Sequence, residues 1–327
     1  MILSQTPLRV SLCSADYPDH YLEFGGAFVG FTVSQYIYVT VRKSPKHAGY
    51  HSRLVYSEME TVNDNSEIQH RAIRATLEHL NIKDGVECIT FADINARSGL
   101  GSSAAFIVGL TKALSVLQGK ELSYHPLAEA AIFIEASRMN VTTGIQDHVH
   151  STYGGITYCK ITKDNDFIRS PVLLKCDQEA YLKSYLLLFH TGISRSASDV
   201  AQTYVGRKEN IEVNKELTHL SAEIFNTLKE VDIEKMAQYV EDGWQLKRKL
   251  SSSVSSNFLD DLHDTAILNG ALAVRVCGAG GGGVVLVVAP PKSHGAIRKA
   301  FHNLAEIDFN IVHSGSRVIL NTEEKRC

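Results

Sequence analysis

Cysteine is scarce in this chain, with 6 residues among 327, and no two of them form a C-x-x-C pair. That pattern excludes the common zinc-ligand spacing and argues against a disulfide framework. Scattered cysteines are typical of a reducing compartment, so we expect a cytoplasmic protein. The six lie far apart in the sequence, at Cys13, Cys88, Cys159, Cys176, Cys277 and Cys327.

An excess of charge of either sign is also missing. Lysine and arginine total 33 against 36 aspartates and glutamates, which gives a net charge of −3. No global positive field therefore exists to attract a nucleic-acid backbone or an anionic membrane surface. We expect neither partner, and any anionic ligand must be held by a local site.

Long hydrophobic runs are absent as well. The longest bulky uncharged run covers residues 24–41, but it contains three glycines, and its second half alternates polar and apolar positions. Alternation is typical of a strand rather than a membrane span. Arg9 interrupts the first apolar stretch, so we expect no cleaved signal segment.

What remains is ordinary globular composition. Apolar residues make up 44% and charged residues 21% of the chain. At about 150 residues per domain, the length predicts about two domains. The sequence does not indicate an oligomeric state.

The first half of the chain has the pattern of a sheet followed by helices. Segments 8–12, 26–32 and 36–42 are rich in β-branched and aromatic residues, which predicts strands. A capping-box pattern at residues 66–69, followed by apolar residues at near-helical spacing, predicts a helix that ends near Asn81. We further expect strands over 87–93 and 156–161, and helices over 106–117 and 127–138.

The second half predicts a separate α+β domain. A polar stretch over residues 162–170 is closed by Pro171, and we place the domain boundary near residue 175. The predicted domains are therefore 1–175 and 176–327. The pattern is helical between Asp199 and Lys249. We also expect strands over 185–190, 273–277, 284–288 and 317–320, and helices over 258–269 and 293–304.

A glycine- and serine-rich segment, residues 98–105 (SGLGSSAA), precedes the apolar stripe of a helix. Glycines let backbone N–H groups approach an anion, and the positive end of the helix dipole points to the same place. The segment predicts a phosphate-binding turn. Ser102 and Ser103 either cap the helix or face a phosphate oxygen or its Mg²⁺. The surrounding pattern does not fit a dinucleotide-binding βαβ unit, and no Walker-type G-x-x-x-x-G-K-[ST] occurs.

A second glycine loop covers residues 278–283 (GAGGGG) and is flanked by predicted strands. A tight hairpin needs only one or two glycines, whereas five cost backbone entropy on folding. The loop therefore indicates a close approach to a ligand or to another loop.

Two acidic residues are candidates for chemistry. Asp147 lies in a predicted loop, where an aspartate either deprotonates a hydroxyl or serves as a turn cap. Glu135, near the end of a predicted helix, is a candidate ligand for a divalent cation. His148 and His150 form an H-x-H pattern without a third ligand nearby, which is more typical of solvated histidines than of a metal site.

Three motifs in this order resemble those of the GHMP kinase superfamily, whose members phosphorylate small-molecule hydroxyls with ATP. They are residues 7–12 (PLRVSL), 99–105 (GLGSSAA) and 278–283 (GAGGGG). Within it, the chain resembles the heptose 7-phosphate kinases of surface-sugar biosynthesis over nearly its whole length. The matching segments include 144–147 (GIQD), 191–197 (TGISRSA) and 244–247 (WQLK).

The resemblance implies a two-domain fold, with a left-handed βαβ unit in the N-terminal domain, a ferredoxin-like C-terminal domain, and MgATP between them. Asp147 would accept the proton of the sugar hydroxyl, with Arg9 orienting it. Ser103 or Ser102 would hold Mg²⁺ together with Glu135. The resemblance assigns the ATP phosphates to Gly99, Leu100, Gly101, Ser102, Ser103 and Ala104. It assigns the substrate to Asp16, Arg195, Arg275, Gly278, Gly280 and Gly281, with the two arginines as candidates for a substrate phosphate.

Two departures from the family pattern concern the substrate. Residues 13–18 (CSADYP) stand where related kinases have a longer Gly-Gly-Gly-Thr-Asp run, and Ile145 stands in place of a lysine before Asp147. The leading interpretation is an ATP-dependent kinase of the anomeric hydroxyl of heptose 7-phosphate. The alternatives are a kinase of fucose, galactose or another modified sugar, and a non-catalytic sensor of sugar or nucleotide.

Overall fold

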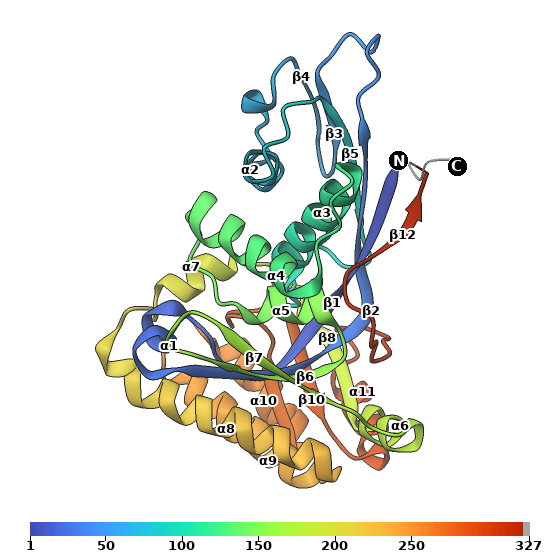
Figure 1. Ribbon diagram of the computed structural model, residues 1–327. Helices are drawn as coiled ribbons and strands as arrows, with labels where there is room; N and C mark the ends of the chain where they lie inside the picture. Colours follow the sequence, from blue (N-terminus) through green and yellow to red (C-terminus); the bar gives the residue numbers. More distant parts are fainter. Residues whose placement is uncertain (323–327) are drawn as a thin grey trace.

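A computed structural model describes residues 1–322, and its strands form two separate sheets (Figure 1). The larger sheet has the order β12-β1-β2-β5-β3-β4, and β6 and β7 extend it from β2. The smaller sheet is antiparallel in the order β11-β8-β10-β9. The strands are β1 (Ile2–Ala15), β2 (Gly26–Lys43), β3 (Ser52–Val55), β4 (Met59–Val62), β5 (Val86–Ala92), β6 (Ile156–Ile161), β7 (Phe167–Val172), β8 (Leu186–His190), β9 (Ala273–Val276), β10 (Val284–Val288), β11 (Ala305–Glu306) and β12 (Arg317–Asn321).

The helices pack against both sheets. Helix α3 packs on β1 and β2, whereas α8 packs on the same two strands and on α9. The helices are α1 (Pro18–Phe24), α2 (Arg71–His79), α3 (Ser102–Leu117), α4 (Tyr124–Phe133), α5 (Gln146–Tyr153), α6 (Cys176–Ser184), α7 (Ala197–Gln202), α8 (Ile211–Glu230), α9 (Ile233–Arg248), α10 (Asn257–Leu268) and α11 (His294–Ala300), with a π-helical turn over Ile134–Arg138 after α4.

Strand β2 organises the larger sheet because its two halves have different partners. Its first half, from Gly26, pairs with β6, and its second half, to Lys43, pairs with β5, while β1 runs along its other edge. In Figure 1 these long strands extend from the upper arm of β3, β4, β5 and α2 to the lower body near β6. The separate strands expected over 26–32 and 36–42 are therefore one strand.

The helices expected after the capping box and between Asp199 and Lys249 have different bounds in the structure. The helix predicted from the capping box at 66–69 begins only at Arg71, because Asp64 caps a short 3₁₀ turn and His70 caps α2. The helical region between Asp199 and Lys249 is divided into α7, α8 and α9. Its last break occurs because Val231 adopts a left-handed conformation and Asp232 starts a new helix as its cap.

The polar stretch at 162–170 is a hairpin rather than a linker. Residues 162–166 turn the chain, and β7 then pairs with β6 along its full length. Pro171 is tolerated there because β7 is an edge strand. At the other end of the chain, β12 pairs with β1, so residues 317–321 join the larger sheet although they follow the predicted boundary at 175.

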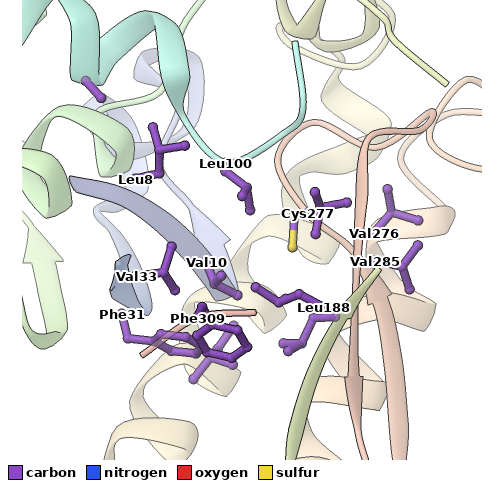
Figure 2. Close-up of a cluster of buried hydrophobic side chains, with 14 of the residues drawn as sticks. Leu8, Val10, Phe31, Val33, Leu100, Leu188, Val276, Cys277, Val285 and Phe309 are labelled. Atoms are coloured by element: carbon purple, nitrogen blue, oxygen red, sulfur yellow. The ribbon is translucent and has the colours of Figure 1, made fainter. Parts of the chain in front are cut away.

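A hydrophobic cluster joins the two sheets (Figure 2). Leu8 and Val10 come from β1, whereas Leu188 and Val285 come from the smaller sheet, and all four are buried. Leu100, from the predicted phosphate-binding turn, is fully buried in the same cluster. The core thus fixes this turn relative to both sheets.

No helix in residues 1–322 is long and apolar enough to cross a membrane. Five cysteines lie in this range and are free thiols, and Cys176 alone among these five is exposed. Cys327 lies outside the described residues.

Candidate active site

A cavity of about 1050 Å³ lies where the two halves of the chain meet. Its walls include the phosphate-binding turn, the start of α5 and the loop after β1 from the first half of the chain. Arg195, Lys247 and Gly278 line it from the second half. Aromatic side chains at Tyr56 and Phe91 line a further part of its wall.

The phosphate-binding turn leads directly into the N-terminus of α3, as its sequence predicts. Gly101 precedes the helix with φ of 76°, and no side chain caps the first turn. The first N–H groups of α3 are thus left without a capping side chain at the cavity wall. Gly99, Gly101, Ser102, Ser103 and Ala104 all line the cavity. An uncapped helix start beside glycines is a suitable site for a phosphate group.

The two glycine loops pack against each other, backbone to backbone. A Cβ atom on Gly99 would lie 2.7 Å from the carbonyl oxygen of Cys277, and one on Gly283 would lie 2.2 Å from that of Ser98. The N–H of Val284 donates to the Ser98 carbonyl at 2.8 Å. Contact with the first loop, one of the two alternatives that the sequence left open, therefore accounts for Gly283 and also for Gly278, whose Cβ atom would lie 2.9 Å from the Gly99 carbonyl oxygen.

Arg9 and Asp147 form an ion pair on the cavity wall. Nε and Nη2 of Arg9 donate to Oδ1 of Asp147 at 2.8 and 2.6 Å, and Nη1 donates to the Gly99 carbonyl at 2.6 Å. Arg9 is 2% exposed, whereas the Asp147 side chain is 26% exposed. Oδ2 of Asp147 accepts no hydrogen bond from the described residues, and it lies 3.2 Å from the position of a Cβ atom on Gly101. Asp147 thus presents one unoccupied oxygen to the phosphate-binding turn.

A second acidic group, Glu135, contacts the start of α3 directly after that turn. Ser103 Oγ donates to Oε1 of Glu135 at 2.5 Å, and Thr143 Oγ1 donates to Oε2 at 3.1 Å. His148 Nε2 lies 2.9 Å from the same Oε2. Burial raises the pKa of Glu135, but the contacts from His148, Ser103 and Thr143 outweigh burial and hold that pKa below its usual value. Glu135 is therefore a carboxylate at neutral pH.

His148 and His150 are buried, contrary to the solvated histidines expected from the H-x-H pattern. The pattern falls inside α5, where the two side chains pack beneath the site. Burial lowers the pKa of His150 to about 3, so this ring is neutral.

Asp16 lines the cavity but uses both carboxylate oxygens to hold α5. Oδ2 accepts from the backbone N–H of Gln146 at 3.0 Å, and Oδ1 accepts from Nε2 of Gln146 at 3.1 Å. Burial raises the pKa of Asp16. The side chain therefore positions the helix that carries Asp147.

Four predicted site residues do not line the cavity. Leu100 lies in the core, and Arg275 is buried, with Nη1 bonded to the Leu12 carbonyl. Gly280 and Gly281 pack against Val254 and Ser253. The cavity therefore gives no support to the assignment of these four residues to ATP or substrate, which stays a prediction. Arg195 does line the cavity, although it also donates to the carbonyls of Gly280, Cys277 and Arg97.

Lys247 also lines the cavity, although sequence reasoning gave it no role beyond its place in the matching segment 244–247. It lies on α9 in the apolar stripe that contains Val240 and Trp244, and it is 6% exposed. A lysine in the apolar stripe of a helix could have indicated a site, because a buried ammonium group requires a polar partner or ligand beside it.

Comparison with known proteins identifies the family to which this chain belongs. Models of the GHMP kinase N-terminal and C-terminal domains match residues 67–155 and 226–306. The chain belongs to the GHMP kinases. Its activity is that of a phosphotransferase acting on an alcohol group, as in sugar kinases, and GHMP kinases use ATP as phosphate donor.

The chain is similar to individual members of that family over most of its length. A D-glycero-alpha-D-manno-heptose 7-phosphate kinase of Campylobacter jejuni is 26% identical, over 91% of this chain and 92% of that protein. A bifunctional fucokinase/GDP-fucose pyrophosphorylase of Arabidopsis thaliana is 25% identical, over 76% of this chain but 24% of that protein. The crystal structure of a D-glycero-D-manno-heptose 1-phosphate kinase from Bacteroides thetaiotaomicron superposes with a TM-score of 0.82 at 20% identity, covering 99% of this chain and all of that one.

Proposed function

We propose that this protein transfers the γ-phosphoryl group of ATP to the anomeric hydroxyl of D-glycero-D-manno-heptose 7-phosphate. The observation that carries the proposal is the free Oδ2 of Asp147, held beside the phosphate-binding turn by the Arg9 ion pair. Similarity to a heptose 7-phosphate kinase over nearly the whole of both chains supports the acceptor.

In this reaction Asp147 is the general base. The acceptor oxygen forms a bond to the γ-phosphorus, the bond from that phosphorus to the ADP oxygen breaks, and the acceptor proton moves to Asp147 Oδ2. Arg9 fixes the orientation of the carboxylate, since its three hydrogen bonds connect Asp147 to the Gly99 carbonyl. Uncapped N–H groups at the start of α3 stabilise negative charge on the phosphates.

The residues around Glu135 fit a Mg²⁺ ion. Carboxylate and hydroxyl oxygens are the ligands that Mg²⁺ prefers, and the ion commonly takes only one or two protein ligands beside phosphate oxygens. Glu135 and Ser103, which already contact each other, would hold it, with Ser102 also on the cavity wall. When bound, Mg²⁺ neutralises charge on the ATP phosphates.

Glu135→Gln is expected to raise the Mg²⁺ concentration needed for half-maximal rate by about tenfold or more. Substitution of a residue that contacts a metal only indirectly already lowers metal affinity by about tenfold, and Glu135 is assigned as a direct ligand. The amide keeps the shape of the side chain but removes its charge. Initial rates over a Mg²⁺ titration at fixed ATP measure the effect. The matched control is Glu129→Gln, an exposed carboxylate on α4. An unchanged Mg²⁺ requirement in the Glu135 variant would rule out the assignment.

The acceptor is tested by comparing kcat/KM for heptose 7-phosphate, unphosphorylated heptose, mannose, fucose and galactose. Turnover that depends on the 7-phosphate supports the proposal. Turnover with a neutral sugar alone would favour the second candidate, a kinase of fucose, galactose or another modified sugar. The observation behind that candidate is the shortened loop at residues 13–18, because Ser14, Asp16 and Tyr17 line the cavity.

A non-catalytic sensor is the remaining alternative. Such a protein would bind ATP or sugar without releasing ADP in any of these reactions. The Arg9–Asp147 ion pair and the separate Ser103–Glu135 hydrogen bond at this cavity favour an enzyme, since a sensor needs no general base.

A further inference from the structure

Lys247 lies in the cavity wall with most of its hydrogen-bonding capacity unused. Its Nζ donates to the Gly278 carbonyl at 2.5 Å, which is the only acceptor found for it among residues 1–322. An ammonium group has three N–H donors. Two of them thus remain for a ligand in the cavity that Lys247 lines.

The titratable groups that act electrostatically on Lys247 lie on two strands and in the loop after β1. Arg275 on β9 and Arg9 on β1 are cations, whereas Asp16 and the Cys13 thiol are the acidic groups. Arg9 is committed to Asp147, and Arg275 is turned toward the Leu12 carbonyl. Arg195, another cation that lines the cavity, bonds three backbone carbonyls.

We infer that Lys247 binds a phosphate group on the acceptor. This inference rests on the proposed function and assigns the contact to the 7-phosphate of the heptose. The acceptor is favoured over ATP because the phosphate-binding turn and α3 already provide the N–H groups for the nucleotide. Lys247 instead shares the cavity wall with Asp16, which acts on it electrostatically and lies in the segment 13–18 that distinguishes this chain.

The charge of this contact changes near neutral pH. Burial lowers the pKa of Lys247 to about 7, and Arg275 acts in the same direction. The amine is therefore a cation below this pH and neutral above it. Binding of an anion is present at low pH and is lost as the pH rises through 7, although a bound anion shifts the transition upward.

Sulfate is a suitable probe, because its charge does not change over this range. We would titrate it by calorimetry into the enzyme already saturated with Mg²⁺ and a non-hydrolysable ATP analogue, at about pH 6 and about pH 8.5. With a pKa of about 7, the protonated fraction of Lys247 falls roughly 30-fold between the two conditions, and sulfate affinity is expected to fall by up to that factor.

Three variants give the expected pattern. Lys247→Met removes the pH-dependent sulfate binding, and it raises KM for heptose 7-phosphate while KM for ATP stays constant. Lys247→Arg retains binding at both pH values, because a guanidinium stays charged. Lys235→Met, an exposed lysine on the same helix, behaves as the wild type. Thermal unfolding of each variant shows whether it has folded.

Sulfate affinity that is equal in the wild type and Lys247→Met, or that is independent of pH in the wild type, would overturn the inference. If Lys247→Met does not fold, the inference is still tested by comparing the pH dependence of sulfate affinity in the wild type and in Lys247→Arg. Lysine-dependent sulfate binding without turnover of heptose 7-phosphate would leave the anion contact standing and overturn heptose 7-phosphate as the acceptor. If Lys247→Met turned over heptose 7-phosphate with an unaltered KM for that sugar, the proposed function would stand and the Lys247 contact would be overturned.

Discussion

Asp147→Asn is expected to lower kcat by about 10²- to 10⁴-fold, the usual contribution of a positioned general base. Asparagine has nearly the same shape, and its amide oxygen accepts the bonds from Arg9 at the position of Oδ1. The variant should therefore fold and bind ATP, but it has no oxygen that takes up the acceptor proton. Coupled ADP release measures the loss of turnover, and nucleotide binding by calorimetry measures what is retained.

The matched control for this substitution is Asp242→Asn, an exposed aspartate on α9. It tests whether loss of one negative charge alone affects the rate. A kcat for Asp147→Asn within a few-fold of the wild type would show that another group accepts the proton. Loss of ATP binding in that variant would indicate damage to the phosphate-binding turn instead.

Arg9→Met is expected to lower kcat by about 10²- to 10³-fold, comparable to loss of one preorganised electrostatic group. It should also destabilise the fold by about 3 kcal/mol, because the Arg9 ion pair is largely buried and its removal leaves the Asp147 carboxylate without a partner. Arg9→Lys should not restore activity. A single ammonium group does not reproduce the fork that reaches both Asp147 and the Gly99 carbonyl.

A double-mutant cycle separates the catalytic from the structural effect of Arg9. If Arg9 acts through Asp147, the double variant with Asp147→Asn should lose little more kcat than Asp147→Asn alone. Fully additive losses would mean that Arg9 acts independently of the base. Arg42→Met, which removes an exposed arginine paired with Glu87, is the control for thermal stability.

Local sequence patterns were sufficient to predict that residues 98–105 form a turn that leads into a helix. The glycines and serines of residues 98–105 are contiguous, and they need only the following helix to form a site. The pairing of Arg9 with Asp147 is different, because 138 positions separate the two residues. Only the resemblance to a known family indicated that pair, and only the fold brings its atoms to hydrogen-bond distance.

Arg275 and Lys247 show what a linear pattern does not contain. Arg275 stands just before the second glycine loop, but the strand β9 turns its side chain away from the cavity toward the Leu12 carbonyl. Lys247 lies 31 positions before Gly278, to whose carbonyl it bonds. Proximity in sequence suggested the first residue as a ligand, whereas packing of α9 brings the second to the cavity.

The most direct test is to identify the product by ³¹P nuclear magnetic resonance after incubation of the enzyme with MgATP and heptose 7-phosphate. We expect ADP and a sugar bisphosphate in equal amounts, with the new phosphorus coupled to the anomeric proton. That result requires both transfer from ATP and the anomeric hydroxyl as acceptor. Formation of inorganic phosphate alone, a new phosphorus coupled to any other sugar proton, or no consumption of ATP would contradict the proposed reaction.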